Sequence, residues 1–306
     1  MKVLLSNDDG VDAPGLWALH KAISEFAEVV VVAPATERSA VGHGISVYNN
    51  VTLRRHVREE HSWGFGLDGT PADCVKMALS VVMRDDPPDL VISGINRGQN
   101  TGTSILYSGT VAAAMEATMA GLPAIAISQA VWLPPSTRTE KVRGAPTHTS
   151  DIVTALARTQ TDYDAAAQFA ARLTRQVAAN GLPPGILLNV NVPMLPADEI
   201  RGVCISKMGK SVFVDNFCVV DECDDFTCYR NLGDRLIESP VGEDWDDLVL
   251  HRGEISVTPL HYDMTHHGML DRLRQWALEE DSAAKVAEDS MAEPLGTGVR
   301  PEVFEP

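Results

Sequence analysis

Several features that mark other classes of protein are missing from this chain of 306 residues. It has no run of about eighteen or more apolar residues, so the sequence predicts no transmembrane helix. Its first residues lack the basic segment of a signal peptide, and we therefore expect a cytoplasmic location. Positive charge is also scarce, since 25 Lys and Arg stand against 42 Asp and Glu, for a formal net charge of −17. This balance argues against a nucleic-acid polymer as partner, because such proteins usually carry a basic face.

Cysteine is sparse as well. The chain has 5 cysteines, an odd number, and without a secretion signal they are expected to be free thiols. Cys218, Cys223 and Cys228 are evenly spaced, but the C-x-x-C spacing and the clustered His residues of a zinc site are missing. We therefore interpret them as reduced thiols rather than as zinc ligands.

Short apolar runs alternate with helical patterns along the first two thirds of the chain. A buried strand over residues 3–5 is followed by a helix over 14–26 and a second strand over 29–33, which is a βαβ unit with parallel strands. Further strands are expected over 90–93, 124–128, 186–193 and 254–260. Helices are expected over 71–83, with Thr70 as N-cap, over 164–179 and over 270–280. Alternating residues over 45–53 and 63–67 predict an antiparallel excursion. The pattern is typical of an α/β fold with a mostly parallel sheet flanked by helices.

Composition divides the chain into three parts. Residues 1–195 carry the α/β pattern and are expected to form the catalytic domain, interrupted by a surface insertion over 132–160 that is rich in Pro, Thr, Arg and His and holds one short helix near residue 152. Residues 196–280 are interpreted as a smaller, β-rich C-terminal extension. Residues 281–306 are acidic and poor in large apolar residues, so we expect a flexible tail.

Two adjacent carboxylates, Asp8 and Asp9, follow the first strand directly. In open α/β sheets the working site lies beyond the carboxyl ends of the strands, so this pair should lie at the edge of a site. Two like charges at that spacing raise a pKa or require a cation, and a hard divalent ion such as Mg²⁺ would satisfy them. The alternative is a simple polar turn, and the tripeptide taken alone favours it. Ser39 comes from the loop after the second strand and is a plausible neighbour.

A second polar region follows the strand over 90–93. The loop over 94–102 is rich in glycine and amide side chains and contains Asn96 and Asn100. Ser108, Gly109 and Thr110 then begin a helix, whose unpaired amides and neighbouring hydroxyls could bind an anion. From the residues alone, a helix cap is slightly favoured over an anion site.

The order of these loops resembles the SurE family of stationary-phase survival proteins, which are 5′/3′-nucleotidases. The similar motifs include Asn-Asp-Asp-Gly at 7–10, Arg-Ser-Ala at 38–40, Ser-Gly-Ile-Asn at 93–96 and Tyr-Ser-Gly-Thr-Val at 107–111. Gly-Thr-Pro-Ala-Asp-Cys-Val at 69–75, Leu-Asn-Val-Asn-Val-Pro at 188–193 and Ser-Val-Thr-Pro-Leu at 256–260 extend the similarity to about residue 273. Each motif is weak alone, but their common order makes chance similarity very improbable.

The resemblance implies a Rossmann-like domain with one divalent metal ion per subunit, Mg²⁺ or Mn²⁺, and phosphatase activity on nucleoside 5′- and 3′-monophosphates. It assigns the metal to Asp8, Asp9, Ser39 and Asn96, with the two aspartates as catalytic residues. It assigns phosphate binding to Asn100, Ser108, Gly109 and Thr110. It also implies activity on short polyphosphate and a homodimer or homotetramer in which the C-terminal extension is exchanged between subunits.

Parts of the chain depart from the family pattern, and rival functions remain. The insertion over 132–160 is longer than expected, and the segment over 212–243 does not match. We favour metal-assisted attack by water, with Asp9 the most sensitive residue, although an aspartate could act as base or nucleophile. The rivals are a haloacid-dehalogenase-type phosphatase, whose Asp-x-Asp spacing is not present, a dinucleotide-dependent oxidoreductase, whose G-x-G-x-x-G is not found after the first strand, and a non-catalytic nucleotide-binding regulatory protein.

Overall fold

The computed structural model describes residues 1–58, 61–131, 161–231, 236–237 and 239–276. The chain forms two compact units, Met1–Tyr262 and Asp263–Pro306. The predicted insertion over 132–160, its short helix and the predicted tail over 281–306 lie outside the described residues. The domain boundaries at 195 and 280 stay predictions. Every helix that the structure describes is too short or too polar to cross a lipid bilayer.

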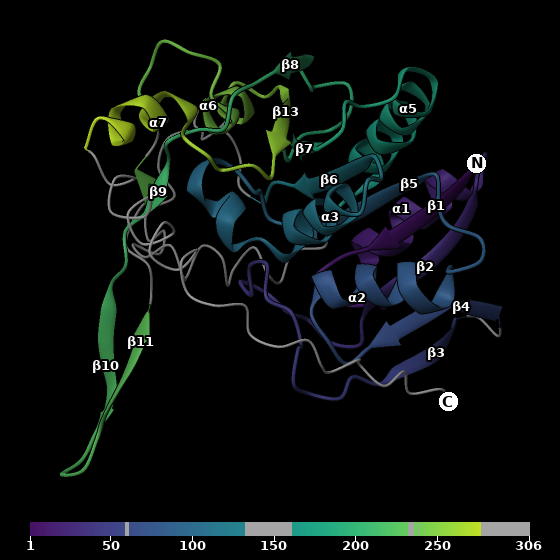
Figure 1. Cartoon of the computed structure of the whole chain (residues 1–306), viewed down its shortest axis with the longest axis horizontal. Coiled ribbons are helices and arrows are strands. Elements are labelled where there is room, and N and C mark those ends of the chain that lie inside the picture. The colour runs from purple at the N-terminus through teal and green to yellow at the C-terminus, as the bar shows by residue number, and fades with distance from the viewer. Residues whose placement is uncertain (59–60, 132–160, 232–235, 238, 277–306) are drawn as a thin grey trace, which may run out of the picture. The chain divides into compact units, whose positions relative to one another are not determined.

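The first unit is built on a nine-stranded sheet with the strand order β3-β4-β2-β1-β5-β6-β7-β13-β8 (Figure 1). The strands from β4 to β7 are parallel, whereas β3 pairs antiparallel with β4 and β13 pairs antiparallel with β7. This confirms the α/β fold with a mostly parallel sheet. The strands are β1 Lys2–Ser6, β2 Glu28–Pro34, β3 Leu53–Arg58, β4 His61–Leu67, β5 Leu90–Arg97, β6 Ala124–Gln129, β7 Ile186–Val192, β8 Val203–Ile205 and β13 Ile255–His261.

Four further strands form two short antiparallel pairs outside this sheet. β10 (Phe217–Glu222) pairs with β11 (Thr227–Asn231), and β9 (Val212–Phe213) pairs with β12 (Leu236–Ile237). A short helix, α6 (Asp246–His251), precedes β13. The part of the chain after β7 is therefore rich in β structure among its described residues, as the sequence predicts.

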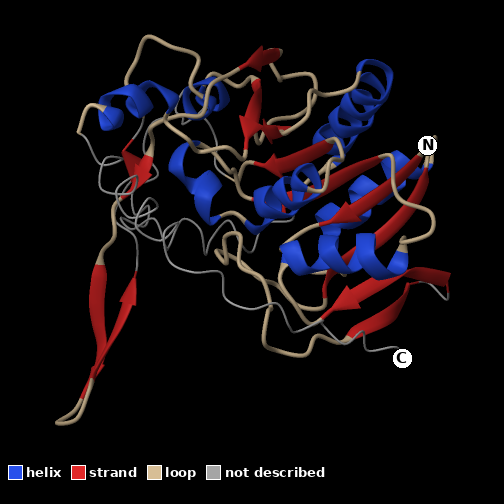
Figure 2. Cartoon of the chain, in the orientation of Figure 1, coloured by secondary structure: helices blue, strands red, loops and turns tan. Residues whose placement is uncertain are grey.

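Helices cover both faces of the sheet (Figure 2). On one face α1 (Pro14–Ser24) and α5 (Asp164–Asn180) pack together. On the other face lie α2 (Pro71–Met77), which continues as the π-helical η1 (Ala78–Val82), and α3 (Gly109–Met119). The strands alternate between the two cores, because successive side chains point to opposite faces. Leu5 of β1 thus belongs to the core under α1, and Leu4 to the core under α2 and α3.

The start of α2 shows how local sequence fixes an element that lies beside the sheet. Thr70 Oγ1 accepts a hydrogen bond from the Asp73 amide at 3.1 Å, and the Thr70 amide donates to Asp73 Oδ2 at 2.9 Å. This reciprocal capping box satisfies two of the amides that a helix start leaves without intrahelical partners. Pro71 occupies the first turn, where its missing N–H costs nothing. The predicted cap is therefore confirmed.

The structure differs most from the predicted strands and helices at three places. Residues 45–52 form a loop rather than a strand, and β3 begins only at Leu53, where its pairing with Leu67 of β4 starts. The alternation there does not mark a buried face, since the Tyr48 side chain is 98% exposed. β5 runs on to Arg97, so Asn96 lies in the strand end rather than in a loop. In the second unit, α7 (His267–Arg274) begins three residues before the predicted helix, whose last four residues lie outside the described residues.

A close approach of two strands makes Gly94 a sensitive position. Its φ is +135°, and a Cβ placed there would lie 2.2 Å from the Ile127 carbonyl oxygen of β6. Gly121 also has a positive φ, +85°, but a Cβ there would meet nothing within 4 Å. We expect Gly121→Ala to cost about 1–3 kcal/mol of backbone strain. Gly94→Ala should cost about 1–3 kcal/mol more, because the added methyl group overlaps backbone.

Urea unfolding of the two variants and the wild type measures this difference. Equal losses in the free energy of unfolding for Gly94→Ala and Gly121→Ala would contradict the close approach of β5 and β6 at this point.

Candidate functional site

The predicted site residues lie at the carboxyl ends of adjacent parallel strands. β1 lies between β2 and β5 in the sheet. The chain first passes from β1 to β2 on one side and only later forms β5 on the other side of β1. Such a switch point opens a crevice in which ligands of open α/β sheets bind. Asp8 and Asp9 follow β1, the loop carrying Ser39 follows β2, and Asn96 lies at the end of β5.

A cavity of about 520 Å³ lies at this edge of the sheet. Among its lining residues are Asp8, Ser39, Asn96, Asn100 and Ser108, all of them predicted from the sequence. The rest of its wall consists of Ala40, Arg97, Gln99, Thr103, Ser104, Tyr107, Val212, Asp215 and Asn231. Three predicted residues, Asp9, Gly109 and Thr110, do not line the cavity. Segments from the whole length of the first unit therefore meet here.

The first turn of α3 is directed at Asp8. Thr110 Oγ1 donates to Asp8 Oδ1, and the backbone amides of Gly109 and Thr110 also donate to this carboxylate. Burial raises the pKa of Asp8, and these hydrogen bonds act in the opposite direction. Gly109 has to be glycine, since a Cβ there would lie 2.8 Å from Asp8 Cβ. The helix N-terminus thus holds a carboxylate with the donors that the sequence assigned to phosphate.

Ser108 is the N-cap of α3. Its Oγ accepts a hydrogen bond from the Val111 amide at 3.1 Å. A helix cap, rather than an anion site, is what the residues alone favoured at this position. Because Ser108 also lines the cavity, the cap and a role in binding are compatible.

Asp9 is fixed from the other side, by β5. Its Oδ2 accepts the Arg97 amide at 3.0 Å. Burial and then the neighbouring charge of Asp8 raise the pKa of Asp9 to about 7. Both aspartates are thus costly to ionise together without a cation, which is the situation that the adjacent carboxylates predicted.

Ser39 and Asn96 carry the remaining oxygen atoms that the sequence assigned to a metal. Ser39 Oγ donates to Glu37 Oε1 at 2.6 Å on an exposed part of its loop. Asn96 Nδ2 donates to the Gly98 carbonyl at 2.7 Å, so Oδ1 is the atom that could act as ligand. The Arg38 amide donates to the Asp8 carbonyl at 2.7 Å and ties the loop after β2 to the loop after β1.

The residues present fit a hard divalent cation. Two carboxylates, a hydroxyl and an amide oxygen form an all-oxygen donor set, which suits Mg²⁺ or Mn²⁺ better than softer metals. A cation would also offset the cost of ionising Asp8 and Asp9 together. Within the described residues, no group of three or more His, Cys, Asp and Glu side chains is placed to hold a metal.

A buried network that the sequence reasoning missed surrounds Asn100. Asn191 Oδ1 accepts the Asn100 amide at 2.7 Å, while Asn191 Nδ2 and Asn189 Nδ2 donate to the Asn100 carbonyl at 3.1 and 2.8 Å. The Asn100 side chain donates to Ser128 Oγ at 2.9 Å. The motif over 188–193 was recognised, but its asparagines carried no assigned role. Two asparagines on one face of a buried strand were the available signal.

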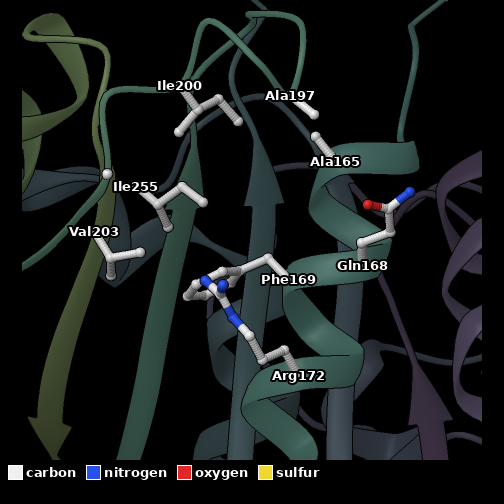
Figure 3. Close-up of a pocket in the computed structure, with 9 residues that line it drawn as sticks. Ala165, Gln168, Phe169, Arg172, Ala197, Ile200, Val203 and Ile255 are labelled. Atoms are coloured by element: carbon white, nitrogen blue, oxygen red, sulfur yellow. The ribbon is translucent and has the colours of Figure 1, made fainter.

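A second cavity, of about 400 Å³, lies between α5 and β8 (Figure 3). Phe169, Ile200, Val203 and Ile255 form much of its wall, and the guanidinium of Arg172 lies 5.0 Å from the centre of the Phe169 ring. None of the predicted site residues lines it. Its polar side chains, Gln168 and Arg172, are exposed, so the cavity by the aspartates is the better candidate site.

The fold and this edge of the sheet define an α/β protein with an acidic site at a topological switch point. A family model described as "Survival protein SurE" matches residues 3–215. The chain therefore belongs to the SurE family.

Relatives of known name agree with this assignment. The chain is 41% identical over 280 residues to a protein of Syntrophobacter fumaroxidans named 5′-nucleotidase SurE, covering 91% of this chain and 100% of that protein. A protein of the same name from Heliobacterium modesticaldum is 39% identical over 90% of this chain and 92% of its own length. The crystal structure of the SurE protein from Aquifex aeolicus superposes with a TM-score of 0.71 at 30% identity, covering 90% of this chain and 100% of that one.

The contact between Thr110 and Asp8 can be tested by a near-isosteric change. Thr110→Val removes the hydroxyl donor to a buried carboxylate, and we expect a loss of about 1–3 kcal/mol in the free energy of unfolding. Thr110→Ser keeps the hydroxyl and should recover most of this loss. Urea denaturation near pH 8 measures both. A Thr110→Ser variant as unstable as Thr110→Val would contradict a role for the hydroxyl group.

Proposed function

We propose that this chain is a divalent-metal-dependent phosphomonoesterase that hydrolyses nucleoside 5′- and 3′-monophosphates to nucleoside and phosphate. The observation that carries the proposal is the pair of neighbouring carboxylates, buried Asp8 and half-buried Asp9, beside a cavity large enough for a small ligand. The names of its relatives, 5′-nucleotidase SurE, support the reaction class. Activity on 3′-monophosphates and short polyphosphate extends the proposal beyond those names.

One Mg²⁺ or Mn²⁺ ion per subunit is proposed to be held by Asp8, Asp9, Ser39 and Asn96. When bound, the ion supplies Lewis-acid stabilisation for the charge of the phosphoryl group. The chain itself keeps the ligands in place. Asp8 is oriented by the first turn of α3, and Asp9 by the Arg97 amide.

The chain's polar groups are proposed to orient the phosphate and the attacking water. Asn100 and Ser104 line the cavity with amide and hydroxyl groups that can donate to phosphate oxygens. Asp9, which the Arg97 amide holds through Oδ2 only, is proposed to accept a proton from the water. We therefore assign the catalytic roles to Asp8 and Asp9.

The aspartyl-phosphate mechanism is disfavoured by the surroundings of Asp8. A nucleophilic carboxylate needs an oxygen with a free path to phosphorus. Asp8 instead accepts hydrogen bonds from the Thr110 hydroxyl and from two backbone amides of α3, which fix its orientation and lower its nucleophilicity. Asp9 is tied through Oδ2 to the Arg97 amide. Attack by water agrees better with both contacts.

The whole proposal can be tested by assaying phosphate release from AMP, 3′-AMP and p-nitrophenyl phosphate with Mg²⁺, Mn²⁺ or EDTA. The wild-type protein should release phosphate only with a divalent ion present. Asp9→Asn should lower kcat/KM by about 1000-fold or more, since it removes a ligand and the proton acceptor together.

The matched control is Asp12→Asn, three residues further along the same loop, where the carboxylate is exposed. It should leave kcat/KM within about twofold, because exposed substitutions away from a site rarely matter. Phosphate release that survives both EDTA and Asp9→Asn would refute the proposed metal-dependent mechanism.

Metal binding can also be followed without any substrate. A ligand that binds only the folded state stabilises it, by about 2.7 kcal/mol at a concentration of 100 times Kd. Millimolar Mg²⁺ should therefore raise the Tm of EDTA-treated wild-type protein and of Asp12→Asn, but not that of Asp9→Asn. A thermal-shift series at constant ionic strength measures this. An equal rise in Tm for Asp9→Asn would place the ion elsewhere.

A further inference from the structure

The backbone over residues 100–103 is held on both sides by buried side chains from distant parts of the chain. From β7, Asn191 pairs with both the amide and the carbonyl of Asn100, as a neighbouring strand would. The Asn191 side chain is fully buried. A buried amide that satisfies both backbone groups of one residue fixes that residue's position, since moving it would leave polar groups unpaired.

On the other side, the carboxylate of Asp246 binds the backbone of Gly102. Both of its oxygens lie 3.1 Å from the Gly102 amide, across 144 positions of sequence. Asp246 Oδ1 also accepts the amides of Gly209 and Asp247 at 2.9 Å. The side chain is fully buried, at the first residue of α6.

Ser211 adds a backbone contact to the same segment. Its carbonyl accepts the Thr103 amide at 3.1 Å and the Thr103 hydroxyl at 2.8 Å. Gly102 has a φ of +54°, and a Cβ there would lie 2.0 Å from Ser211 Oγ, so the two segments are packed as closely as glycine allows. The segment therefore depends on residues after β7 for its shape.

These contacts matter because the segment carries residues that line the cavity beside Asp8. Asn100 is its first residue, and its last two residues begin the helical turn η2 (Gly102–Tyr107), which leads into Ser108 at the start of α3. Asn100, Thr103 and Ser104 all line the cavity beside Asp8. A displacement of Gly102 would move this wall, whereas Asp8 and Asp9 have their own anchors in α3 and β5.

We infer that Asn191 and Asp246 are positioning residues that fix the wall of the nucleotide cavity formed by Asn100, Thr103 and Ser104. This inference rests on the proposed function. Within the segment over 100–103 the two side chains bind backbone groups, and neither side chain lines the cavity, so they act on the affinity for the nucleotide rather than on the chemical step.

Asp246→Asn is the central test, because it keeps the size of the side chain and replaces one acceptor oxygen by a donor. The Oδ1 atom that remains in the variant can still accept the amides of Gly209 and Asp247, so the variant is expected to fold. The matched control is Asp247→Asn. Asp247 is the adjacent residue, equally buried, and accepts the Ser239 amide at 2.9 Å instead of the segment over 100–103.

Two measurements are made on the full chain with Mg²⁺, namely steady-state kinetics on AMP and amide hydrogen exchange of Gly102 and Thr103. For Asp246→Asn we expect KM to rise about 10- to 100-fold with kcat within about threefold of wild type, and faster exchange at both amides. Asp247→Asn should leave KM and exchange at these amides unchanged. Asn191→Asp, which removes the donor to the Asn100 carbonyl, should raise KM in the same way.

Three outcomes would overturn the inference. One is faster exchange in Asp246→Asn with an unchanged KM, and another is a fall in kcat at constant KM. The third is a rise in KM in Asp247→Asn as large as in Asp246→Asn, which would indicate a general structural effect.

Failure of the proposed function has a different signature. If the wild-type protein binds AMP in calorimetry but releases no phosphate, the proposed reaction is refuted. The inference is then judged on the Kd for AMP, with the same ratios expected between variants. If the wild-type protein neither hydrolyses nor binds AMP, both are refuted.

Discussion

The desolvation of two neighbouring carboxylates at the end of β1, buried Asp8 and half-buried Asp9, is the constraint around which the site is arranged. Ionisation of Asp8 and of Asp9 is costly in this position, and each carboxylate accepts hydrogen bonds from a different element. The first turn of α3 donates to Asp8, and the β5 backbone donates to Asp9. These contacts explain why β1, β5 and α3 keep a fixed relation at this edge of the sheet, and why glycine occupies position 109. They reduce the cost of the paired charges without removing it.

Because the start of α3 is occupied by Asp8, the positive end of that helix is not free for a phosphate group. The proposed binding of a phosphomonoester would then depend on the proposed cation and on the polar wall that includes Asn100, Thr103, Ser104 and Ser108. That wall is held by Asn191 of β7 and by Asp246 near β13, both far away in sequence. The part of the chain after β7 therefore contributes to the geometry of the site as well as to the sheet.

Much of this arrangement could be predicted from the sequence, since it follows from local patterns. The apolar run of β1 ending in Asp8 and Asp9 placed the carboxylates at the sheet edge, and the capping pattern at Thr70 gave the start of α2. The contacts of Asp246 could not be predicted. A carboxylate that accepts a backbone amide 144 positions away leaves no periodicity or spacing to detect. The strand predicted over 45–52 was wrong for the opposite reason. Its residues alternate locally, but the pairing with β4 begins only at Leu53, so no strand pairing supports the pattern there.

The charge of the chain leads to a last consequence for the proposed reaction. A phosphate dianion entering the cavity would face Asp8 and Asp215 in its wall, in a chain with a net charge of −17. Coulomb repulsion at a few ångströms in a partly buried site is worth several kcal/mol. A bound divalent ion would reverse the sign of this interaction, so the metal and the nucleotide would each increase the affinity for the other. The acidic residues of the site would thereby make binding of the proposed substrate conditional on the metal, and the proposed hydrolysis would be restricted to the metal-loaded state.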